Sequence, residues 1–309
     1  MRVVFWGTPE FAAPALRALI GEGFEVVGVV TQPDKPQGRS RRVISPPVKQ
    51  IALEEEIPVH QPKNARDLEL IKTLEGLKPD ISVVVAYGHI LPKKVIDLPR
   101  LGTLNIHASL LPALRGAAPI QAAIREGMSE TGVTVMRVVP ALDAGPMIMQ
   151  AATPIFEDET YGELQVRLAE LGALTLVEAL TLVSLDKAPE TIQDESLATY
   201  ASKVTRESAR INWRDTALQI SRHIRAYDPK PGAFTSTPKG DVKLFGPKVM
   251  DGIKADPGEV LKVTGELVIA CGIDALRIAD VQPEGKKRMT AHEWARGRGV
   301  AVGDRYGGD

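Results

Sequence analysis

Three polar residues have the types and spacing to perform acyl transfer without a covalent nucleophile. Asn105 and His107 stand two positions apart at the end of an apolar, β-branched run, and Asp143 follows the next such run. Because side chains alternate across a strand, this spacing places Asn105 and His107 on the same side. An amide can donate to a developing oxyanion, and a carboxylate near an imidazole fixes its tautomer. The sequence therefore predicts a site at which these three side chains converge on one ligand.

Each of the three residues, taken alone, also has a purely structural interpretation. Asn105 can cap a turn, His107 can be a hydrogen-bonded histidine at a strand end, and Asp143 can stabilise its own loop. The functional interpretation is favoured by their grouping, because all three are expected near the carboxyl ends of strands.

The elements that position these residues follow from the hydrophobic pattern. Apolar, β-branched runs alternate with helical patterns, which is typical of parallel strands buried on both faces. We expect an α/β fold with a doubly wound, mostly parallel, Rossmann-like sheet. Ligands of such sheets bind beyond the carboxyl ends of the strands, and Asp143 should share that edge if its strand neighbours the strand of His107. The predicted strands cover 2–6, 26–31, 81–86, 103–107 and 133–139, and the predicted helices cover 13–20, 48–56, 120–125 and 161–185.

The last third of the chain has a different pattern. A polar segment over 190–207 lacks periodicity and is interpreted as a linker after a catalytic domain over 1–189. One helical stretch over 217–227 and five short strand-like runs separated by Gly and Pro follow it. They predict a small, OB-like β-barrel over 208–309, with a final helix capped by Thr290.

Composition limits the class of protein. The 309 residues are 44 % hydrophobic and 25 % charged, as in ordinary globular domains, which excludes a disordered, collagenous or membrane protein. The single cysteine, Cys271, cannot form an intrachain disulfide, and no Cys/His cluster has the spacing of a zinc site. We see no export or membrane-insertion signal and expect a cytoplasmic protein.

Charge is unevenly distributed along the chain. The net charge is −1, but residues 208–309 contain 17 Lys and Arg against 13 Asp and Glu. The basic surplus is by itself weak evidence for a polyanionic partner, because solvated surfaces often carry one of this size.

The residues around the predicted site resemble a known family. NIHASLLPALRGAAPI at 105–120, with TGVT and LDAG downstream, resembles the folate-dependent formyltransferases. FWGTPEFAAPAL at the start, TQPDKPQGR and AYGHILP resemble the members of that family that act on charged tRNA, and the similarity covers nearly the whole chain. The resemblance implies transfer of a formyl group from 10-formyltetrahydrofolate to the α-amine of methionine on charged initiator tRNA. No metal is required for this chemistry, and we expect a monomer.

The resemblance also implies a role for each residue of the site. Asn105 would hold the formyl oxygen, His107 would stabilise the tetrahedral intermediate and move protons, and Asp143 would position and polarise His107. The folate-binding residues implied are Ser109, Leu110, Leu111, Pro112, Tyr87, Gly88, Ile90 and Leu91. The implied tRNA-binding residues are Arg39, Arg41 and Arg42 in a basic loop, and Lys286, Lys287 and Arg288 in the C-terminal domain.

Three positions depart from the family pattern. Ala108 stands where proline is usual, and Ala113 and Leu114 stand where Arg and Trp are common. None of them is one of the three proposed catalytic residues. They alter the surroundings of the folate segment, where position 113 lacks a basic side chain.

Other functions stay open on the sequence alone. A formyltransferase that acts on a small amine or a sugar nucleotide shares the catalytic residues but needs neither the basic loop nor the barrel. An NAD-dependent oxidoreductase is disfavoured because Gly7-Thr8-Pro9 lacks the GxGxxG pattern, and Pro9 has no amide for a pyrophosphate. A non-catalytic RNA-binding protein on this fold would not account for the presence of Asn105, His107 and Asp143 together.

Overall fold

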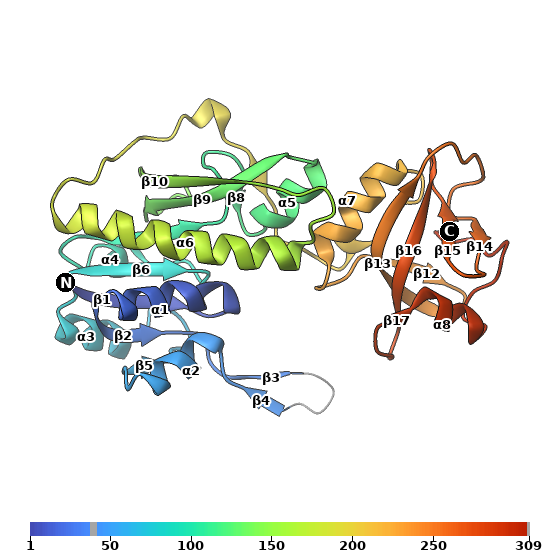
Figure 1. Cartoon of the computed structure of the whole chain (residues 1–309). Coiled ribbons are helices and arrows are strands. Elements are labelled where there is room, and N and C mark those ends of the chain that lie inside the picture. The colour runs from blue at the N-terminus through green and yellow to red at the C-terminus, as the bar shows by residue number, and fades with distance from the viewer. Residues whose placement is uncertain (38–41, 308–309) are drawn as a thin grey trace. The chain divides into compact units, whose positions relative to one another are not determined.

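Residues 1–37 and 42–307 are described by the computed structural model, and they divide into two units (Figure 1). The second unit contains, besides the C-terminal part of the chain, two short segments from within the sequence of the first. The first unit comprises Met1–Pro119, Glu130–Pro154 and Gln165–Ala201, and the second comprises Ile120–Ser129, Ile155–Leu164 and Ser202–Asp309.

A seven-stranded sheet forms the centre of the first unit, in the order β10-β9-β7-β6-β1-β2-β5. Five neighbouring strands from β7 to β5 are parallel, while β9 is antiparallel to β7 and β10 is antiparallel to β9. The predicted mostly parallel α/β sheet is confirmed. The strands are β1 (Arg2–Gly7), β2 (Glu25–Val30), β5 (Val59–His60), β6 (Ile81–Val85), β7 (Thr103–His107), β9 (Glu130–Arg137) and β10 (Met147–Pro154).

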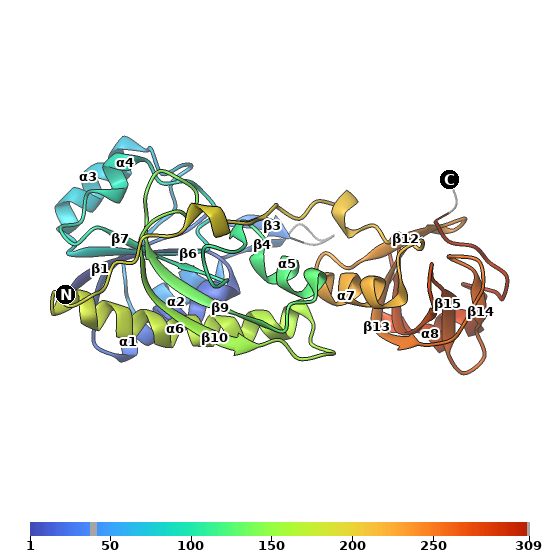
Figure 2. The same ribbon diagram turned by 90° about the horizontal axis from the view of Figure 1, so that it is seen from above.

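Helices cover both faces of this sheet (Figure 2). Alternation along β1 sends Val4 and Trp6 into a core shared with α3 and α4. On the opposite face, Gly172 of α6 lets the helix approach the sheet, because an added Cβ would lie 3.0 Å from the Ile106 side chain. One face carries α1 (Ala13–Gly21), α2 (Pro47–Glu54) and α6 (Tyr161–Ser184), and the other carries α3 (Leu68–Leu77) and α4 (Lys93–Ile96).

Several short elements of the first unit connect distant parts of the chain. β3 (Lys35–Gln37) and β4 (Arg42–Ile44) form a hairpin after β2. β8 (Arg115–Gly116) pairs in parallel with β11 (Tyr200–Ala201). Much of the segment that we interpreted as a linker therefore packs within the first unit, up to Ala201. Two 3-10 turns, η1 (Glu10–Ala12) and η2 (Glu195–Leu197), complete this unit.

An antiparallel sheet curled into a half-barrel forms the second unit, in the order β12-β13-β16-β15-β14 with β17 beside β16. Its inner face packs around buried residues such as Trp213, Leu244 and Ile269. Thr290 accepts a hydrogen bond from the backbone of Glu293 and caps the last helix, as predicted. The elements are α5 (Pro119–Glu126), η3 (Glu207–Ala209), α7 (Ala217–Tyr227), β12 (Phe234–Thr237), β13 (Gly240–Met250), β14 (Val260–Lys262), β15 (Leu267–Ala270), β16 (Ala275–Pro283), β17 (Met289–Thr290) and α8 (Ala291–Arg296). Among the described helices of both units, none has the length and apolar character to cross a membrane.

Candidate active site

Asn105 and His107 lie toward the carboxyl end of β7, as their spacing predicts. β7 lies between β6 and β9, and His107 stands opposite Thr134 of β9. His107 is buried and Asn105 is half-buried. Within the described ranges of the chain, no group hydrogen-bonds the Asn105 amide, so this donor is free for an incoming oxygen atom.

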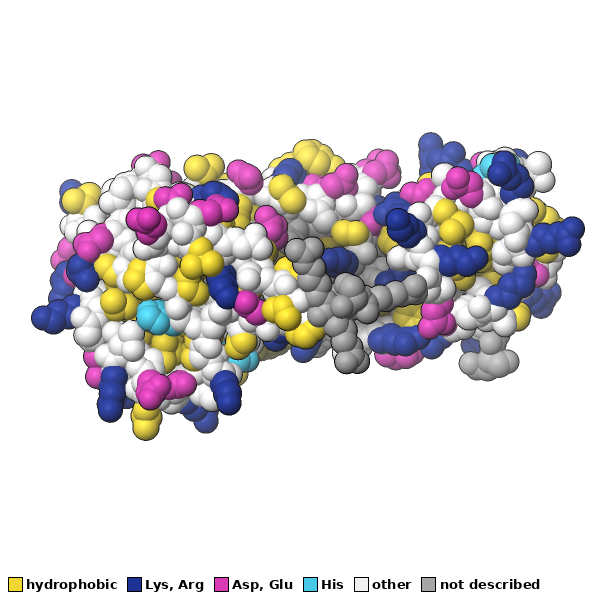
Figure 3. All heavy atoms as spheres, turned by 90° about the horizontal axis from the view of Figure 1, so that it is seen from below, with side chains coloured by type: hydrophobic (Ala, Val, Ile, Leu, Met, Phe, Trp, Pro, Cys, Tyr) yellow, Lys and Arg dark blue, Asp and Glu magenta, His cyan; other side chains and the backbone are white. Residues whose placement is uncertain are grey.

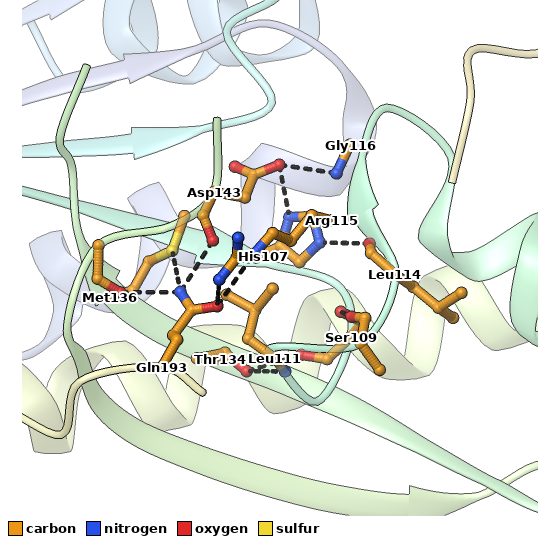
Figure 4. Close-up of polar contacts among 12 residues, drawn as sticks. His107, Ser109, Leu111, Leu114, Arg115, Gly116, Thr134, Met136, Asp143 and Gln193 are labelled. Carbon is orange, nitrogen blue, oxygen red and sulfur yellow. Dashed lines mark hydrogen bonds and ion pairs between the residues drawn. The ribbon is translucent and has the colours of Figure 1, made fainter. Parts of the chain in front are cut away.

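Asp143 reaches His107 by a route that the sequence does not predict. Because β9 is antiparallel to β7, its last residue, Arg137, lies beside Leu104 rather than beside His107. The strand therefore ends at the opposite edge of the sheet, although Asp143 itself lies beside His107 as expected. Residues 138–146 turn back instead, and Oδ2 of Asp143 lies 3.7 Å from Nδ1 of His107 (Figure 4).

Backbone groups of residues 114–116 hold both side chains. Nε2 of His107 donates to the carbonyl oxygen of Leu114 over 2.9 Å, and the Gly116 N–H donates to Oδ2 of Asp143 over 2.8 Å. A carbonyl oxygen can only accept, so Nε2 carries a proton and Nδ1 is the nitrogen that faces the carboxylate. Since 3.7 Å exceeds a hydrogen bond, Nδ1 can share a proton with a reacting group while the carboxylate stabilises the charged ring.

Two buried side chains support the Asp143 loop, Arg115 and Gln193. Arg115 donates to Oε1 of Gln193 over 3.0 and 2.8 Å, and to the Glu195 carboxylate over 2.9 and 2.8 Å. Nε2 of Gln193 donates to the carbonyl oxygens of Asp143 and Gly145, each over 2.8 Å (Figure 4). The sequence marks Arg115 only as part of the 105–120 motif, and it contains no signal for Gln193, which lies in a polar segment without periodicity.

The residues assigned to folate binding follow two neighbouring parallel strands, β6 and β7. In the segment after β7, polar groups are largely engaged within the protein. The Ser109 hydroxyl donates to the Ala113 carbonyl oxygen over 2.6 Å, and the Leu111 N–H donates to the Thr134 hydroxyl over 3.1 Å. The Leu111 carbonyl oxygen accepts from Gln150 over 2.9 Å. Leu110 and Pro112 of the same segment are half-buried.

The segment after β6 contains a buried tyrosine followed by exposed apolar surface. The Tyr87 ring is buried edge-on against Trp6, with ring centroids 5.1 Å apart, and burial raises the pKa of its phenol to about 12. Its hydroxyl has no hydrogen-bond partner among the described residues. Gly88 and Ile90 are exposed, Ile90 to 82 %, whereas Leu91 is buried. The hydroxyl is itself buried, so the surface that this segment offers to a ligand comes from Gly88 and the apolar side chain of Ile90.

The basic residues assigned to tRNA binding differ in their surroundings. Arg39 and Arg41 lie outside the described residues, and Arg42 is the first residue of β4. Lys286 and Lys287 are exposed between β16 and β17. In the right-hand part of Figure 3, Lys and Arg side chains of the C-terminal unit are dispersed among acidic and hydrophobic ones.

Arg288 is engaged within the second unit. Its guanidinium pairs with Asp228 at 3.2 Å and with Asp280 at 2.9 Å, and it stacks over the Phe245 ring at 4.2 Å from the centroid. These contacts fix the side chain to the protein, unlike those of its two lysine neighbours.

Comparisons with known proteins show to which family the chain belongs. Residues 1–180 match the formyl transferase model, and residues 203–299 match the model of the formyl transferase C-terminal domain. A methionyl-tRNA formyltransferase from Methylococcus capsulatus is 48 % identical over 99 % of this chain and 100 % of its own length. The chain belongs to the methionyl-tRNA formyltransferase family. The family resemblance carried by residues 105–120 is thereby confirmed.

Two solved structures share the fold of this methionyl-tRNA formyltransferase family member. An N-formyltransferase from Helicobacter canadensis, in complex with folinic acid and dTDP-3-aminofucose, gives a TM-score of 0.68 at 18 % identity. That match covers 93 % of this chain and 99 % of the other. HypX from Aquifex aeolicus, in complex with tetrahydrofolic acid, gives a TM-score of 0.65 at 20 % identity over 95 % of this chain and 46 % of HypX.

Proposed function

We propose that the protein transfers a formyl group from 10-formyltetrahydrofolate to the α-amino group of methionine on charged initiator tRNA. The product, N-formylmethionyl-tRNA, serves translation initiation, which places the reaction in the cytoplasm. The observation that carries this proposal is the pairing of His107 with Asp143 at the end of β7, two residues from Asn105, whose amide has no hydrogen-bond partner among the described residues. Similarity over the full length to methionyl-tRNA formyltransferases supports the choice of tRNA as the acceptor.

The three side chains suit direct attack of an amine on a formyl group. The neutral methionyl amine forms a bond to the formyl carbon, the bond from that carbon to N10 of the folate breaks, and negative charge develops on the formyl oxygen during the reaction. Asn105 donates to this oxygen, and His107 carries a proton at Nδ1 between the amine and the leaving nitrogen. Asp143 stabilises the positive ring, and Leu114 holds the Nε2–H away from the reacting groups.

Binding of the two substrates is assigned to different parts of the chain. The folate would lie against residues 87–91 and 109–112, where the exposed Ile90 offers apolar surface to a pterin. The acceptor end of the tRNA would meet Arg39, Arg41 and Arg42, because Arg binds phosphate bidentately. Residues 208–309 would bind the rest of the tRNA, with Lys286 and Lys287 free for phosphate and Arg288 orienting their turn. One chain supplies all of these groups, so a monomer suffices.

A formylation assay with two acceptors tests this function. Purified protein is mixed with 10-formyltetrahydrofolate and either charged initiator tRNA or charged elongator methionine tRNA at one salt concentration, because phosphate contacts depend on salt. We expect fast transfer to the initiator alone. Transfer to neither tRNA, together with formylation of a small amine or a sugar nucleotide, would refute the proposal and would favour a small-substrate formyltransferase.

A further inference from the structure

The backbone of Asp143 is in the left-handed region, with a φ of +49°. Aspartate adopts this region more readily than most non-glycine residues, but it remains an uncommon conformation that defines where the side chain points. The residue sits in the nine-residue connection between β9 and β10, over 138–146, and this connection has no regular secondary structure. A carboxylate on such a segment keeps its place beside His107 only if groups outside the loop hold it.

Gln193 supplies this support to the backbone of the loop. Its amide nitrogen donates to the carbonyl oxygens of Asp143 and Gly145, each over 2.8 Å, and its side chain is buried. The Gly116 N–H holds the Asp143 carboxylate from another direction over 2.8 Å. The backbone and the side chain of Asp143 are therefore tied separately, from segments about 50 and about 25 residues away in the sequence.

Arg115 fixes the orientation of the Gln193 amide. Two guanidinium nitrogens donate to Oε1 of Gln193, at 3.0 and 2.8 Å, and a guanidinium cannot accept. The two carbonyl oxygens on the other side of the amide cannot donate, so only one orientation of the amide satisfies all partners. Arg115 is 1 % exposed, and two further hydrogen bonds to the Glu195 carboxylate hold its guanidinium from the other side.

The segment that carries Gln193 is anchored on both sides of it. Thr191 exchanges two backbone hydrogen bonds with Met147, the first residue of β10. Further along, the Thr199 hydroxyl accepts from the Leu114 N–H over 2.8 Å, and β11 pairs with β8. The same residues 114–116 bind His107 and Asp143 through their backbone, so one connected set of hydrogen bonds holds both members of the pair.

We infer that Gln193, oriented by Arg115, is a positioning residue that holds Asp143 beside His107 for the transfer step. It acts through the carbonyl oxygens of the Asp143 loop and touches neither substrate. Loss of its two donors frees the loop to leave the left-handed conformation, which withdraws the carboxylate from the imidazole. The effect falls on kcat, because binding of folate and tRNA is assigned to other residues. The activity test of this inference rests on the proposed formyl transfer.

A double-mutant cycle tests the inference. Gln193→Met keeps the length of the side chain and removes both donors, and Asp143→Asn removes the charge that Gln193 is inferred to position. We expect Gln193→Met to lower kcat about tenfold or more, with KM for both substrates within about twofold of wild type. The double variant should fall within about threefold of Asp143→Asn alone, because Gln193 has no further role once the carboxylate is gone. If the fold-loss of kcat in the double variant equals the product of the fold-losses in the two single variants, the two residues act independently and the inference is overturned.

Two companion variants separate positioning from general damage to the segment. Gln193→Glu still accepts from Arg115 but sets carboxylate oxygens against the two carbonyl oxygens, and it should lower kcat as Gln193→Met does. Asp194→Ala removes the cap of η2 in the same segment, where Asp194 accepts from Ser196 and from no other described residue, and it should leave kcat unchanged. If Asp194→Ala lowers kcat as much as Gln193→Met, loosening of the segment is sufficient and the inference fails.

Hydrogen–deuterium exchange provides a measurement that does not need activity. Gln193→Met should speed exchange at the Gly116 amide and in residues 138–146, relative to wild type and to Asp194→Ala, while β1 and β6 keep their protection. Unchanged exchange in these residues would overturn the inference. If Gln193→Met shows the expected faster exchange but the wild-type protein formylates no tRNA, the inference about positioning stands and the proposed function is refuted.

Discussion

Replacement of Asp143 by asparagine tests how much the charge beside His107 contributes to catalysis. The asparagine amide has nearly the shape of the carboxylate, and its oxygen can still accept from the Gly116 N–H, which now donates over 2.8 Å. The substitution therefore removes the negative charge and leaves the hydrogen bond that holds the side chain. Stability should change little, with a melting temperature within about 2 °C of wild type.

The distance between the two groups sets the size of the effect. A carboxylate and a protonated imidazole 3.7 Å apart attract each other by about 4 kcal/mol at an effective dielectric constant of roughly 20. Water screens the pair little, since the side chains of His107 and Asp143 are only 7 % and 15 % exposed. His107 becomes positively charged when it accepts a proton during formyl transfer. The attraction that arises at that point stabilises the transition state and so lowers the activation barrier of the transfer step. Loss of about 3–4 kcal/mol predicts a rate about 10²–10³-fold lower.

Single-turnover formylation of charged initiator tRNA measures this loss without interference from product release. Asp186→Asn is a matched control, because Asp186 also has a positive φ, of +56°, but is exposed after α6 and away from His107. It should react at the wild-type rate. A folded Asp143→Asn protein within tenfold of wild type would show that the charge does not assist His107, and the electrostatic reasoning would be wrong.

Three further predictions concern other groups. Asn105→Ala removes the free amide and should lower kcat about 100-fold in the same assay, whereas a loss below about tenfold would exclude Asn105 as the oxyanion donor. Gly116→Ala puts a Cβ 2.6 Å from the Ala201 carbonyl oxygen at a φ of +113°, and it should cost about 1–3 kcal/mol in urea unfolding. Gly23→Ala, with open space at a φ of +75°, should cost less, and equal costs would contradict the steric argument. Burial lowers the pKa of His223 below its ordinary 6.5, so the unfolded chain binds the proton first and stability falls as pH drops below 6.5. Replacing this histidine by glutamine (His223→Gln) should therefore flatten the pH dependence of the unfolding free energy by up to about 1.4 kcal/mol per pH unit between about pH 6.5 and 5. Urea unfolding of both proteins at several pH values measures this slope, and identical slopes in wild type and variant would refute the prediction.

Strands and helices with continuous apolar signals could be predicted from the sequence. The central parallel strands are apolar on both faces, and the strands of the second unit are bounded by Gly and Pro, so both sets stand out. Elements that are short or have little hydrophobic periodicity could not be predicted from the sequence. β8 and β11 have two residues each and exist only because they pair across 85 residues. β10 alternates between half-buried and exposed positions along most of its length at the edge of the sheet, and its apolar content is diluted accordingly.

In the candidate site, too, features with a local sequence signal could be predicted and features that depend on long-range contacts could not. Asn105 and His107 could be paired from their spacing, because a strand fixes which side chains share a side. The placement of Asp143 depends on the direction of β9 and on a loop that turns back over nine residues, and neither follows from local periodicity. Gln193 could not be found at all, since its partners are Arg115 and two carbonyl oxygens about 50 residues away. Long-range hydrogen bonds leave no periodic trace in a sequence.

The hydroxyl and thiol groups of the described chain argue for direct transfer between two bound substrates. Ser109, the hydroxyl nearest to His107 in the sequence, donates to the Ala113 carbonyl oxygen over 2.6 Å and is 1 % exposed. The Thr134 hydroxyl donates to the Ser109 carbonyl oxygen over 2.7 Å while it accepts from Leu111. Cys271 lies in the core of the second unit, where burial raises the pKa of its thiol to about 12, so no thiolate forms at neutral pH. A formyl-enzyme intermediate has no suitable acceptor among these groups. This supports the proposal that the amine attacks the formyl donor while both are bound, a step that would need the proposed oxyanion donor, Asn105, and the proposed proton carrier, His107, to be in place beforehand.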